Sequence, residues 1–150
     1  MSVLPRRIHE SGNFALPLPP EQAFPLFTAE GERLWVPGWD PQMLGETPQQ
    51  KGLVFLTGEG EEHTIWTVLE SDPELGRLRY SRVTPRSRAG IVTVTIAGDA
   101  GGSQIQVQYN LTALSFDGSK RLDDYSGDKF RLMLAEWRRL ILEYLEWSGA

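Results

Sequence analysis

The sequence lacks cysteine and contains only two histidines, and this excludes several kinds of chemistry at the outset. Without cysteine there is no disulfide scaffold, no thiol nucleophile and no zinc site built on thiolates. The absence is compatible with a reducing compartment. Arg6 and Arg7 are not followed by the apolar segment that a signal peptide needs, so we expect a cytoplasmic protein.

Basic residues are fewer than acidic ones, and no hydrophobic run is long. The chain has 15 Lys and Arg against 20 Asp and Glu, which gives a formal net charge of -5. This balance disfavours non-specific binding to nucleic acid. No apolar run approaches the roughly 18 residues that a membrane-spanning helix needs. We therefore expect no nucleic-acid partner and no integral membrane association.

No internal repeat, low-complexity tract or Gly/Ser linker divides the 150 residues, so we expect a single domain over 1–150. Apolar residues make up 40% of the chain and charged residues 23%, as in ordinary globular domains. A chain of this length buries roughly 68–70% of its unfolded surface, so it needs neither metal nor disulfide to fold.

The first third of the chain is punctuated by proline. A short strand is predicted over 14–16, and the prolines that follow end it because proline cannot donate to a strand ladder. Residues 21–27 predict a helix that is short or kinked, since Pro25 lies inside it. Thr28 is a candidate cap for a second short helix over 30–34. Residues 35–41 then predict an ordered turn.

Five strand candidates follow in series, at 53–57, 63–69, 78–84, 89–97 and 103–115. The connections between them are short and carry turn residues, which requires antiparallel pairing. In the last two strands apolar and polar residues alternate, so one face of the sheet is apolar and the other meets water.

The C-terminal stretch changes to a helical period. Its apolar stripe consists of Phe130, Met133, Leu134, Trp137, Leu140, Ile141, Tyr144 and Leu145. A helix from Asp128 to Trp147 would be about 30 Å long. Two starts are compatible with the sequence: near Ser119 with a weak point at Gly127, or only at Ser126.

The segment Glu32–Trp39, with sequence Glu-Arg-Leu-Trp-Val-Pro-Gly-Trp, carries the most specific likeness to a known family. It belongs to a longer match over 24–28 and 30–41, and weaker matches lie at 64–68, 80–85 and 109–115. On these residues the chain resembles the START-like superfamily, also called the SRPBCC or helix-grip family, which includes polyketide cyclase/dehydratase-like proteins. Within it the chain looks like the small bacterial members of unassigned function. The likeness covers about 14–147.

The resemblance implies an α+β helix-grip fold, in agreement with the predicted elements. A curved antiparallel β-sheet would wrap around the long C-terminal α-helix, with a short helical pair after the first strand. It also implies a deep, mostly apolar cavity between sheet and helix. Members of the family bind lipids, sterols, polyketides, quinones or plant hormones there, and some are cyclases or dehydratases. No catalytic motif of the family can be carried over to this chain.

We expect this cavity to be lined by aromatic and large apolar side chains together with one arginine. The expected ligand-binding residues are Trp35, Trp39, Phe55, Trp66, Tyr80, Arg82, Val94, Tyr109, Phe130, Met133, Leu134 and Trp137. The last helix contributes its stripe as core first, and as cavity floor where the cavity is open. Trp35 and Trp39 flank a Pro-Gly turn and either plug the end of the core or form the rim of the pocket. For Trp66 we favour the inward face, because a bulky ring gains more from burial.

Strand alternation places Arg82 on the same face as Leu78 and Tyr80, which we take as inward. An unpaired inward charge is costly. Arg82 therefore either reaches solvent from the strand end, or needs a carboxylate, an open cavity mouth or an anionic ligand. In the last case it would anchor the ligand, together with Tyr109.

Other candidate motifs give weaker signals. His63 has acidic neighbours, but adjacent strand positions point to opposite faces, so we expect no metal site there. The sequence contains no zinc-helix motif, phosphate loop or dinucleotide fingerprint, and we expect no cofactor. Residues 77–88 hold five arginines, and residues 21–74 hold 11 acidic and 2 basic residues. We interpret these stretches as cross-strand partners, with a basic patch for a partner or an acidic lipid headgroup as the alternative.

These observations support one leading hypothesis and two alternatives. The leading function is non-covalent binding of a small hydrophobic or amphipathic molecule, of lipid, polyketide or aromatic type, in the internal cavity. The first alternative is a cyclase or dehydratase in which His63, Arg82 and Tyr109 polarise an oxygen or move a proton. The second is a protein-interaction module whose core is filled by side chains. Either a monomer or a homodimer is compatible with the sequence.

Overall fold

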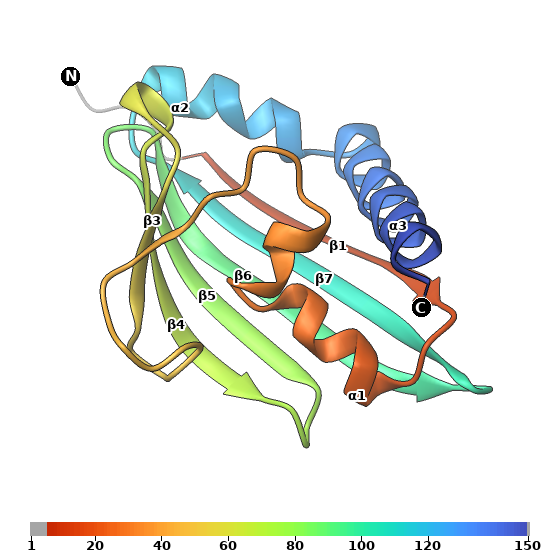
Figure 1. Cartoon of the computed structure of the whole chain (residues 1–150). Helices are drawn as coiled ribbons and strands as arrows, with labels where there is room; N and C mark the ends of the chain where they lie inside the picture. Colours follow the sequence, from red (N-terminus) through yellow and green to blue (C-terminus); the bar gives the residue numbers. More distant parts are fainter. Residues whose placement is uncertain (1–5, 150) are drawn as a thin grey trace.

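Seven antiparallel strands form one curved sheet in the order β1-β7-β6-β5-β4-β3-β2 (Figure 1). The computed structural model describes residues 6–149. The strands are β1 (Arg7–Leu16), β2 (Gln42–Met43), β3 (Val54–Thr57), β4 (Thr64–Asp72), β5 (Arg77–Thr84), β6 (Arg88–Asp99) and β7 (Gly102–Ala113). The first strand, β1, pairs with the last strand, β7, at one edge of the sheet.

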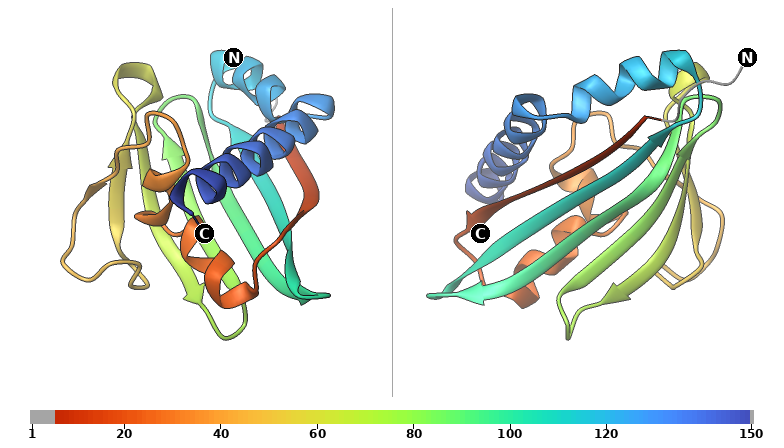
Figure 2. Two further views of the ribbon diagram at one scale, coloured as in Figure 1. Left: turned by 45° about the vertical axis from the view of Figure 1, so that its right-hand side comes forward. Right: turned by 180° about the vertical axis from the view of Figure 1, so that it is seen from behind.

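All helical elements except η3 (Gly60–Glu62), which joins β3 to β4 at the end of the sheet, lie on the concave side of this sheet. They are α1 (Pro20–Ala23), the 3-10 turns η1 (Phe24–Phe27), η2 (Gly31–Leu34) and η4 (Leu122–Tyr125), and the helices α2 (Phe116–Arg121) and α3 (Asp128–Ser148). Figure 2 shows α3 running across the sheet beside β1. This arrangement confirms the predicted α+β helix-grip architecture, including the short helical pair after the first strand. Within residues 6–149, no helix combines the length and the apolar character needed to cross a membrane.

The first strand is longer than the prediction of 14–16. It covers ten residues because β7 provides a backbone partner along its whole length, whatever the polarity of the side chains. In its first half the residues that face α3 are not all apolar, so the sequence shows no clean alternation there. A Cβ at Gly12 would lie 2.7 Å from Leu134 Cδ1, so this glycine gives the helix its close approach to the strand.

The start of the long helix is decided by Gly127. Its φ of +58° with ψ of -126° suits glycine and few other residues, and it interrupts the helical path. Residues before it form the separate elements α2 and η4, and α3 begins at Asp128. The predicted strand over 103–115 ends earlier, at Ala113, because Ser115 caps α2 by accepting a hydrogen bond from the Gly118 N–H at 3.0 Å.

The short helical pair after β1 follows from its prolines and from Thr28. Pro25 stands where one α-helical turn changes to a 3-10 turn, so the predicted helix over 21–27 is short, as expected. The Thr28 hydroxyl accepts a hydrogen bond from the Gly31 N–H at 3.0 Å, at the start of η2. It also donates to the Pro25 carbonyl at 2.8 Å. The predicted turn over 35–41 follows, and the two-residue strand β2 after it was not predicted.

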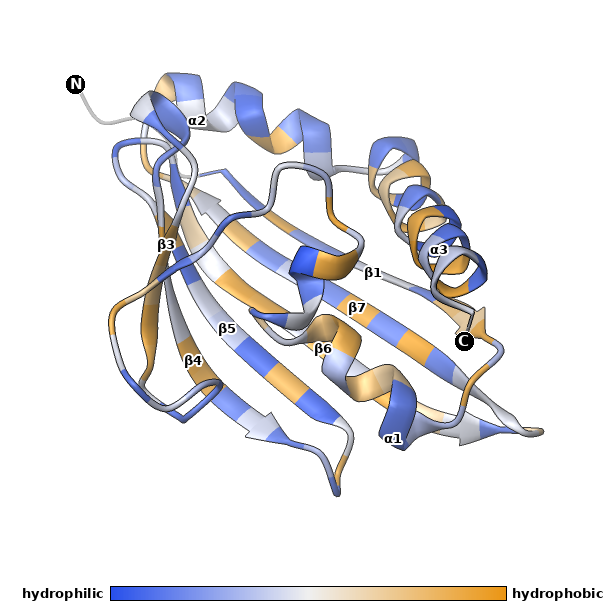
Figure 3. Cartoon of the chain, viewed as in Figure 1, coloured by the Kyte–Doolittle hydropathy of each residue, from blue (hydrophilic) through white to orange (hydrophobic). Residues whose placement is uncertain are grey.

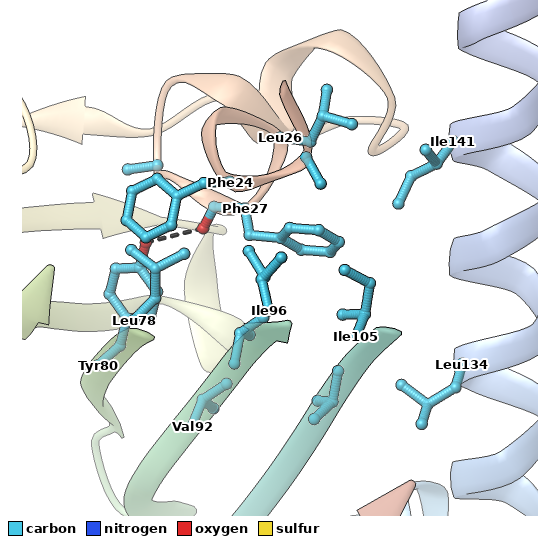
Figure 4. Close-up of a cluster of buried hydrophobic side chains, with 14 of the residues drawn as sticks. Phe24, Leu26, Phe27, Leu78, Tyr80, Val92, Ile96, Ile105, Leu134 and Ile141 are labelled. Atoms are coloured by element: carbon cyan, nitrogen blue, oxygen red, sulfur yellow. Dashed lines mark hydrogen bonds between the residues drawn. The ribbon is translucent and has the colours of Figure 1, made fainter. Parts of the chain in front are cut away.

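The core lies between the concave face of the sheet and the helical layer. Figure 3 shows apolar and polar residues alternating along β5 and β7, as the period of two predicts. Leu78 and Ile105 are fully buried and project from the sheet toward the helical layer (Figure 4). The Tyr80 hydroxyl donates to the Phe27 carbonyl at 2.8 Å, which ties η1 to the sheet (Figure 4).

Candidate functional site

A cavity of about 180 Å³ remains between the sheet, the helical pair and α3. Its walls come from five strands, from η1 and η2 with the loop that follows, and from η4 and α3. The lining residues are Phe27, Glu32, Val36, Trp39, Phe55, Trp66, Tyr80, Arg82, Val92, Val94, Tyr109, Tyr125, Met133 and Trp137. The core is therefore not completely filled, which argues against the filled-core alternative.

Most of the residues predicted to line a cavity contribute to this wall, and three do not. Trp35, Phe130 and Leu134 lie outside it. On α3, Phe130 and Leu134 share one side of the helix and pack toward Gly12 of β1. Met133 and Trp137 are also four residues apart, so they share a side of their own, which is turned toward the cavity. The apolar stripe is broad enough to serve both surfaces, and its period alone does not separate them.

The two tryptophans of the Pro-Gly turn have different roles. Trp35 is buried, and its Nε1 donates to the Leu26 carbonyl at 2.7 Å. Its ring packs edge-on against Trp137 at 5.7 Å, so it closes the core, as the first of the two predicted alternatives states. Trp39 lines the cavity, and its Nε1 donates to the Ala29 carbonyl at 2.8 Å.

Strand register builds an aromatic wall on one side of the cavity. Phe55 of β3 stands directly opposite Trp66 of β4, and their rings stack with centroids 5.7 Å apart and an interplanar angle of 2°. Tyr80 of β5 meets both rings edge-on, each at 6.1 Å. The Trp66 Nε1 donates to the Thr57 hydroxyl at 2.8 Å, which fixes the ring on the inward face. Such a wall suits a flat apolar ligand.

Arg82 is buried in this wall and does not reach bulk solvent, since only 7% of it is exposed. Its register partner is Trp66, and its guanidinium carbon lies 5.0 Å from the centroid of that ring. The Tyr125 ring lies on another side at 5.6 Å. No carboxylate forms an ion pair with Arg82 in the described part of the chain, and its Nε has no hydrogen-bond partner there. Aromatic faces offset part of the cost of burying this charge, and hydrogen-bond capacity is left over.

Glu32 is, with Tyr125, one of two polar cavity residues that sequence reasoning missed. It lies on η2, and its carboxyl lines the cavity. It receives no side-chain hydrogen bond from residues 6–149, and burial raises the pKa of this carboxyl well above its usual value. Glu32 belongs to the segment that carries the most specific family resemblance. A 3-10 turn of four residues is too short for a periodic pattern in the sequence to show which of its side chains point inward.

The cavity tyrosines differ in whether their hydroxyls are already bonded. Tyr80 donates to the Phe27 carbonyl and accepts from the Gln49 Nε2 at 2.6 Å, so its hydroxyl serves the fold. Tyr125 accepts from Arg88 at 3.1 Å. The Tyr109 hydroxyl makes no hydrogen bond with any described residue, and burial raises the pKa of its phenol further above the usual value. Glu32, Arg82 and Tyr109 are thus the cavity residues whose polar side chains make no hydrogen bond within residues 6–149, and the Tyr125 hydroxyl can still donate one.

His63 does not join this group. It lies in a separate surface hollow with Glu61 and Glu62, beyond the end of the sheet, so it does not meet Arg82 and Tyr109. The enzymatic alternative loses the arrangement of three residues on which it was based. Within residues 6–149, no three His, Asp or Glu side chains converge in a way that could hold a metal ion.

Two arginines of 77–88 have acidic partners, and the first of the two pairs joins neighbouring strands as expected, whereas the second reaches η3. Arg77 pairs with Glu70 at 3.3 Å, and Arg88 pairs with Glu62 at 2.9 Å. Arg88 is almost fully buried, while Arg82 faces the cavity. Arg82 and Arg88 are therefore not part of the exposed basic patch that we considered as an alternative.

Solved structures of low sequence identity share the whole architecture. The Mll3558 protein of Rhizobium loti matches with a TM-score of 0.61 at 16% identity, over 89% of this chain and 99% of that one. Ara h 8.0201 matches with a TM-score of 0.66 at 12% identity, over 92% and 99%. Norcoclaurine synthase of Thalictrum flavum, in complex with dopamine and hydroxybenzaldehyde, matches with a TM-score of 0.59 at 12% identity, over 93% and 88%.

No protein-family model and no curated protein matches the sequence. The structural likeness nevertheless shows the fold: the chain has the helix-grip fold that the sequence resemblance predicted. This likeness concerns the fold, and the use of the cavity has to be argued from its own residues.

Proposed function

We propose that the protein binds a small amphipathic molecule non-covalently in the cavity, and that the ligand carries one aromatic ring system and an acidic group. The observation that carries this proposal is Arg82, a buried guanidinium in an aromatic wall with no carboxylate partner among residues 6–149. An anionic ligand group would supply charge-assisted hydrogen bonds that the described residues do not provide.

The size of the cavity favours an aromatic ligand over a lipid or a polyketide. Its volume is about 180 Å³. An apolar cavity of about 150 Å³ takes benzene, whereas sites for drug-sized ligands measure about 300–1,000 Å³. A single ring with short substituents fits this space, and a long acyl chain or a sterol exceeds it.

The structure of norcoclaurine synthase supports the same reading by analogy. It holds dopamine and hydroxybenzaldehyde, which are both single-ring aromatic compounds, and it shares the fold at 12% identity. We transfer only the scale of the ligand, because such low identity says nothing about the chemistry.

The proposal is tested by titrating the protein with benzoate and with toluene, using tryptophan fluorescence and isothermal calorimetry. Both probes should bind the wild type. Arg82→Leu should weaken benzoate binding about tenfold or more, since it removes hydrogen bonds to a charged group, and should leave toluene binding within about twofold. Arg79→Leu is the matched control, because Arg79 lies on the same strand and points to the opposite face. The proposal would be overturned if the wild type bound neither benzoate nor toluene.

Native mass spectrometry of protein purified from its own host gives an independent reading of the ligand class. We expect a stoichiometric adduct with a mass that fits one substituted aromatic ring system. A bound phospholipid or sterol would contradict the size argument. The cytoplasmic location and the monomeric or homodimeric state stay predictions from the sequence.

A further inference from the structure

An acidic and a basic side chain face the cavity from different layers of the fold. Arg82 comes from β5 in the sheet, and Glu32 comes from η2 in the helical layer. Neither forms an ion pair, with the other or with a further residue of the described part of the chain, although the Arg82 charge contributes to lowering the pKa of the Glu62 carboxyl. The cavity therefore has a positive pole and an acidic pole with space between them.

This separation is costly unless a bound molecule uses it. A buried charge without a partner loses its hydration and gains little in return. A protein that needed only stability would place Glu32 and Arg82 in contact, or replace both with apolar side chains. A ligand with one group for each pole would satisfy both side chains at once.

The acidic pole is held in place by the surrounding loop. Gln49 links the two layers, because its Oε1 accepts from the Ala29 N–H at 3.0 Å and its Nε2 donates to the Tyr80 hydroxyl at 2.6 Å. Trp39 donates to the Ala29 carbonyl at 2.8 Å. These bonds fix both ends of the segment that carries Glu32, so a ligand would not have to order it on binding.

Resting on the proposed function, we propose that the ligand is dipolar: an aromatic ring with an anionic group on Arg82 and an ammonium group on Glu32. An ammonium suits the acidic pole best, because a full positive charge offsets the desolvation of a carboxylate more than a neutral donor does. The unbonded Tyr109 hydroxyl is a further donor to the ligand's anionic group. Tyr80 has no such part, because its hydroxyl is already bonded twice.

The proposal is tested with benzoate and with 3- and 4-(aminomethyl)benzoate, which place an ammonium at two distances from the carboxylate. Calorimetric titration of the wild type should show that at least one of the two amines binds about tenfold more tightly than benzoate. In Glu32→Gln this advantage should disappear, while benzoate binds as tightly as in the wild type or more tightly, because the variant removes an acidic group from the cavity.

The control variant is Glu30→Gln, which removes the same charge two residues away. Glu30 is exposed and pairs with Arg33 at 2.9 Å, outside the cavity, so this variant should keep the preference for the amine. Thermal unfolding of each variant checks that it is folded before titration.

The outcomes separate this inference from the proposed function. If benzoate binds but neither amine gains affinity, or if Glu32→Gln weakens benzoate and the amines by the same factor, the dipolar ligand is excluded and the anionic aromatic ligand stands. If neither benzoate nor toluene binds the wild type, the proposed function fails and this inference fails with it.

Discussion

Glu32 illustrates at the scale of one residue how an acidic side chain in a cavity opposes stability. Burial raises the pKa of its carboxyl above the usual 4.5, so the folded state holds this proton more tightly than the unfolded state does. The protonated Glu32 carboxyl costs the folded state nothing below pH 4.5. As the pH rises from there through the pKa of Glu32 in the folded state, the free energy of unfolding falls, because the buried carboxyl must lose its proton. Replacing Glu32 by a neutral isostere should remove that loss.

We therefore predict that Glu32→Gln gains free energy of unfolding relative to the wild type as the pH rises from about 4.5, and that the gain then levels off. Burial also raises the pKa of the Tyr80 and Tyr109 phenols, so these two cavity groups stay neutral and do not contribute to the difference. Urea denaturation across a pH series measures the difference. A difference that is constant with pH would show that the Glu32 carboxyl is solvated.

Arg88 shows the opposite situation, a buried charge with its partner in place. Its side chain is only 2% exposed, and it donates to Glu62 at 2.9 Å. The hydrogen bond from Arg88 lowers the pKa of the Glu62 carboxyl. Glu62 is about half exposed, so the pair is partly screened by water.

Glu62→Gln should lower the free energy of unfolding by about 1–3 kcal/mol at neutral pH, because it leaves the buried Arg88 without a charged partner. Arg121→Met is the control: Arg121 lies 4.0 Å from Glu62 and is half exposed, so its removal should cost less than about 0.5 kcal/mol. Both values come from guanidinium chloride denaturation. If the two substitutions lowered the free energy of unfolding equally, the burial of Arg88 would not strengthen its ion pair with Glu62.

At the scale of elements, the position of the acidic pole depends on the tight contact between η1 and η2. A Cβ at Gly31 would lie 1.7 Å from the Pro25 carbonyl oxygen, which is backbone and cannot move aside alone. This glycine lets the two short turns pack directly on each other, next to Glu32. The sequence shows Gly31 but not the carbonyl that requires it.

Gly31→Ala should reduce the free energy of unfolding by about 2–3 kcal/mol and weaken toluene binding, because the turns must separate at the cavity wall. Gly98→Ala serves as the comparison, since its Cβ would meet only the Pro20 side chain at an ordinary 3.6 Å. Denaturant titration and toluene titration measure the two effects. Unchanged stability of Gly31→Ala would show that the helical pair adjusts without strain.

At the scale of the whole molecule, the cavity exists because the sheet curves away from a helix that contacts mainly β1. The space under β3 to β6 is then closed by the loop with Trp39. Met133 of α3 projects into this space, whereas Leu132, the preceding residue, is 68% exposed. Two consecutive residues of α3 thus point in different directions, Met133 into the cavity and Leu132 into solvent.

Met133→Phe should fill part of the cavity and weaken toluene binding about tenfold or more, while the free energy of unfolding stays equal or rises. Leu132→Phe adds the same ring to the solvent side of the helix and should leave toluene binding within about twofold. Fluorescence titration and thermal unfolding of both variants decide this. Full binding in Met133→Phe would place the ligand elsewhere on the molecule.

The local pattern of the sequence was enough to predict the strands at β3 to β7, the helical pair and the long C-terminal helix. Two-residue alternation and helical periodicity are properties of neighbouring residues, so they can be read without knowing what the element packs against. The inward position of Arg82 followed from the same alternation. The polar half of β1 was not predicted, because its pairing depends on β7, nearly a hundred residues away in the chain.

The cavity itself was decided only by tertiary structure. Trp35 and Trp39 are four residues apart in one turn, yet one closes the core and the other lines the cavity. Phe130 and Met133 divide in the same way on α3. Burial patterns in sequence distinguish inside from outside, but a filled interior and a hollow one both require apolar side chains. Whether Glu32 and Arg82 meet depends on the distance between sheet and helical layer, which is set by the packing of all the elements together.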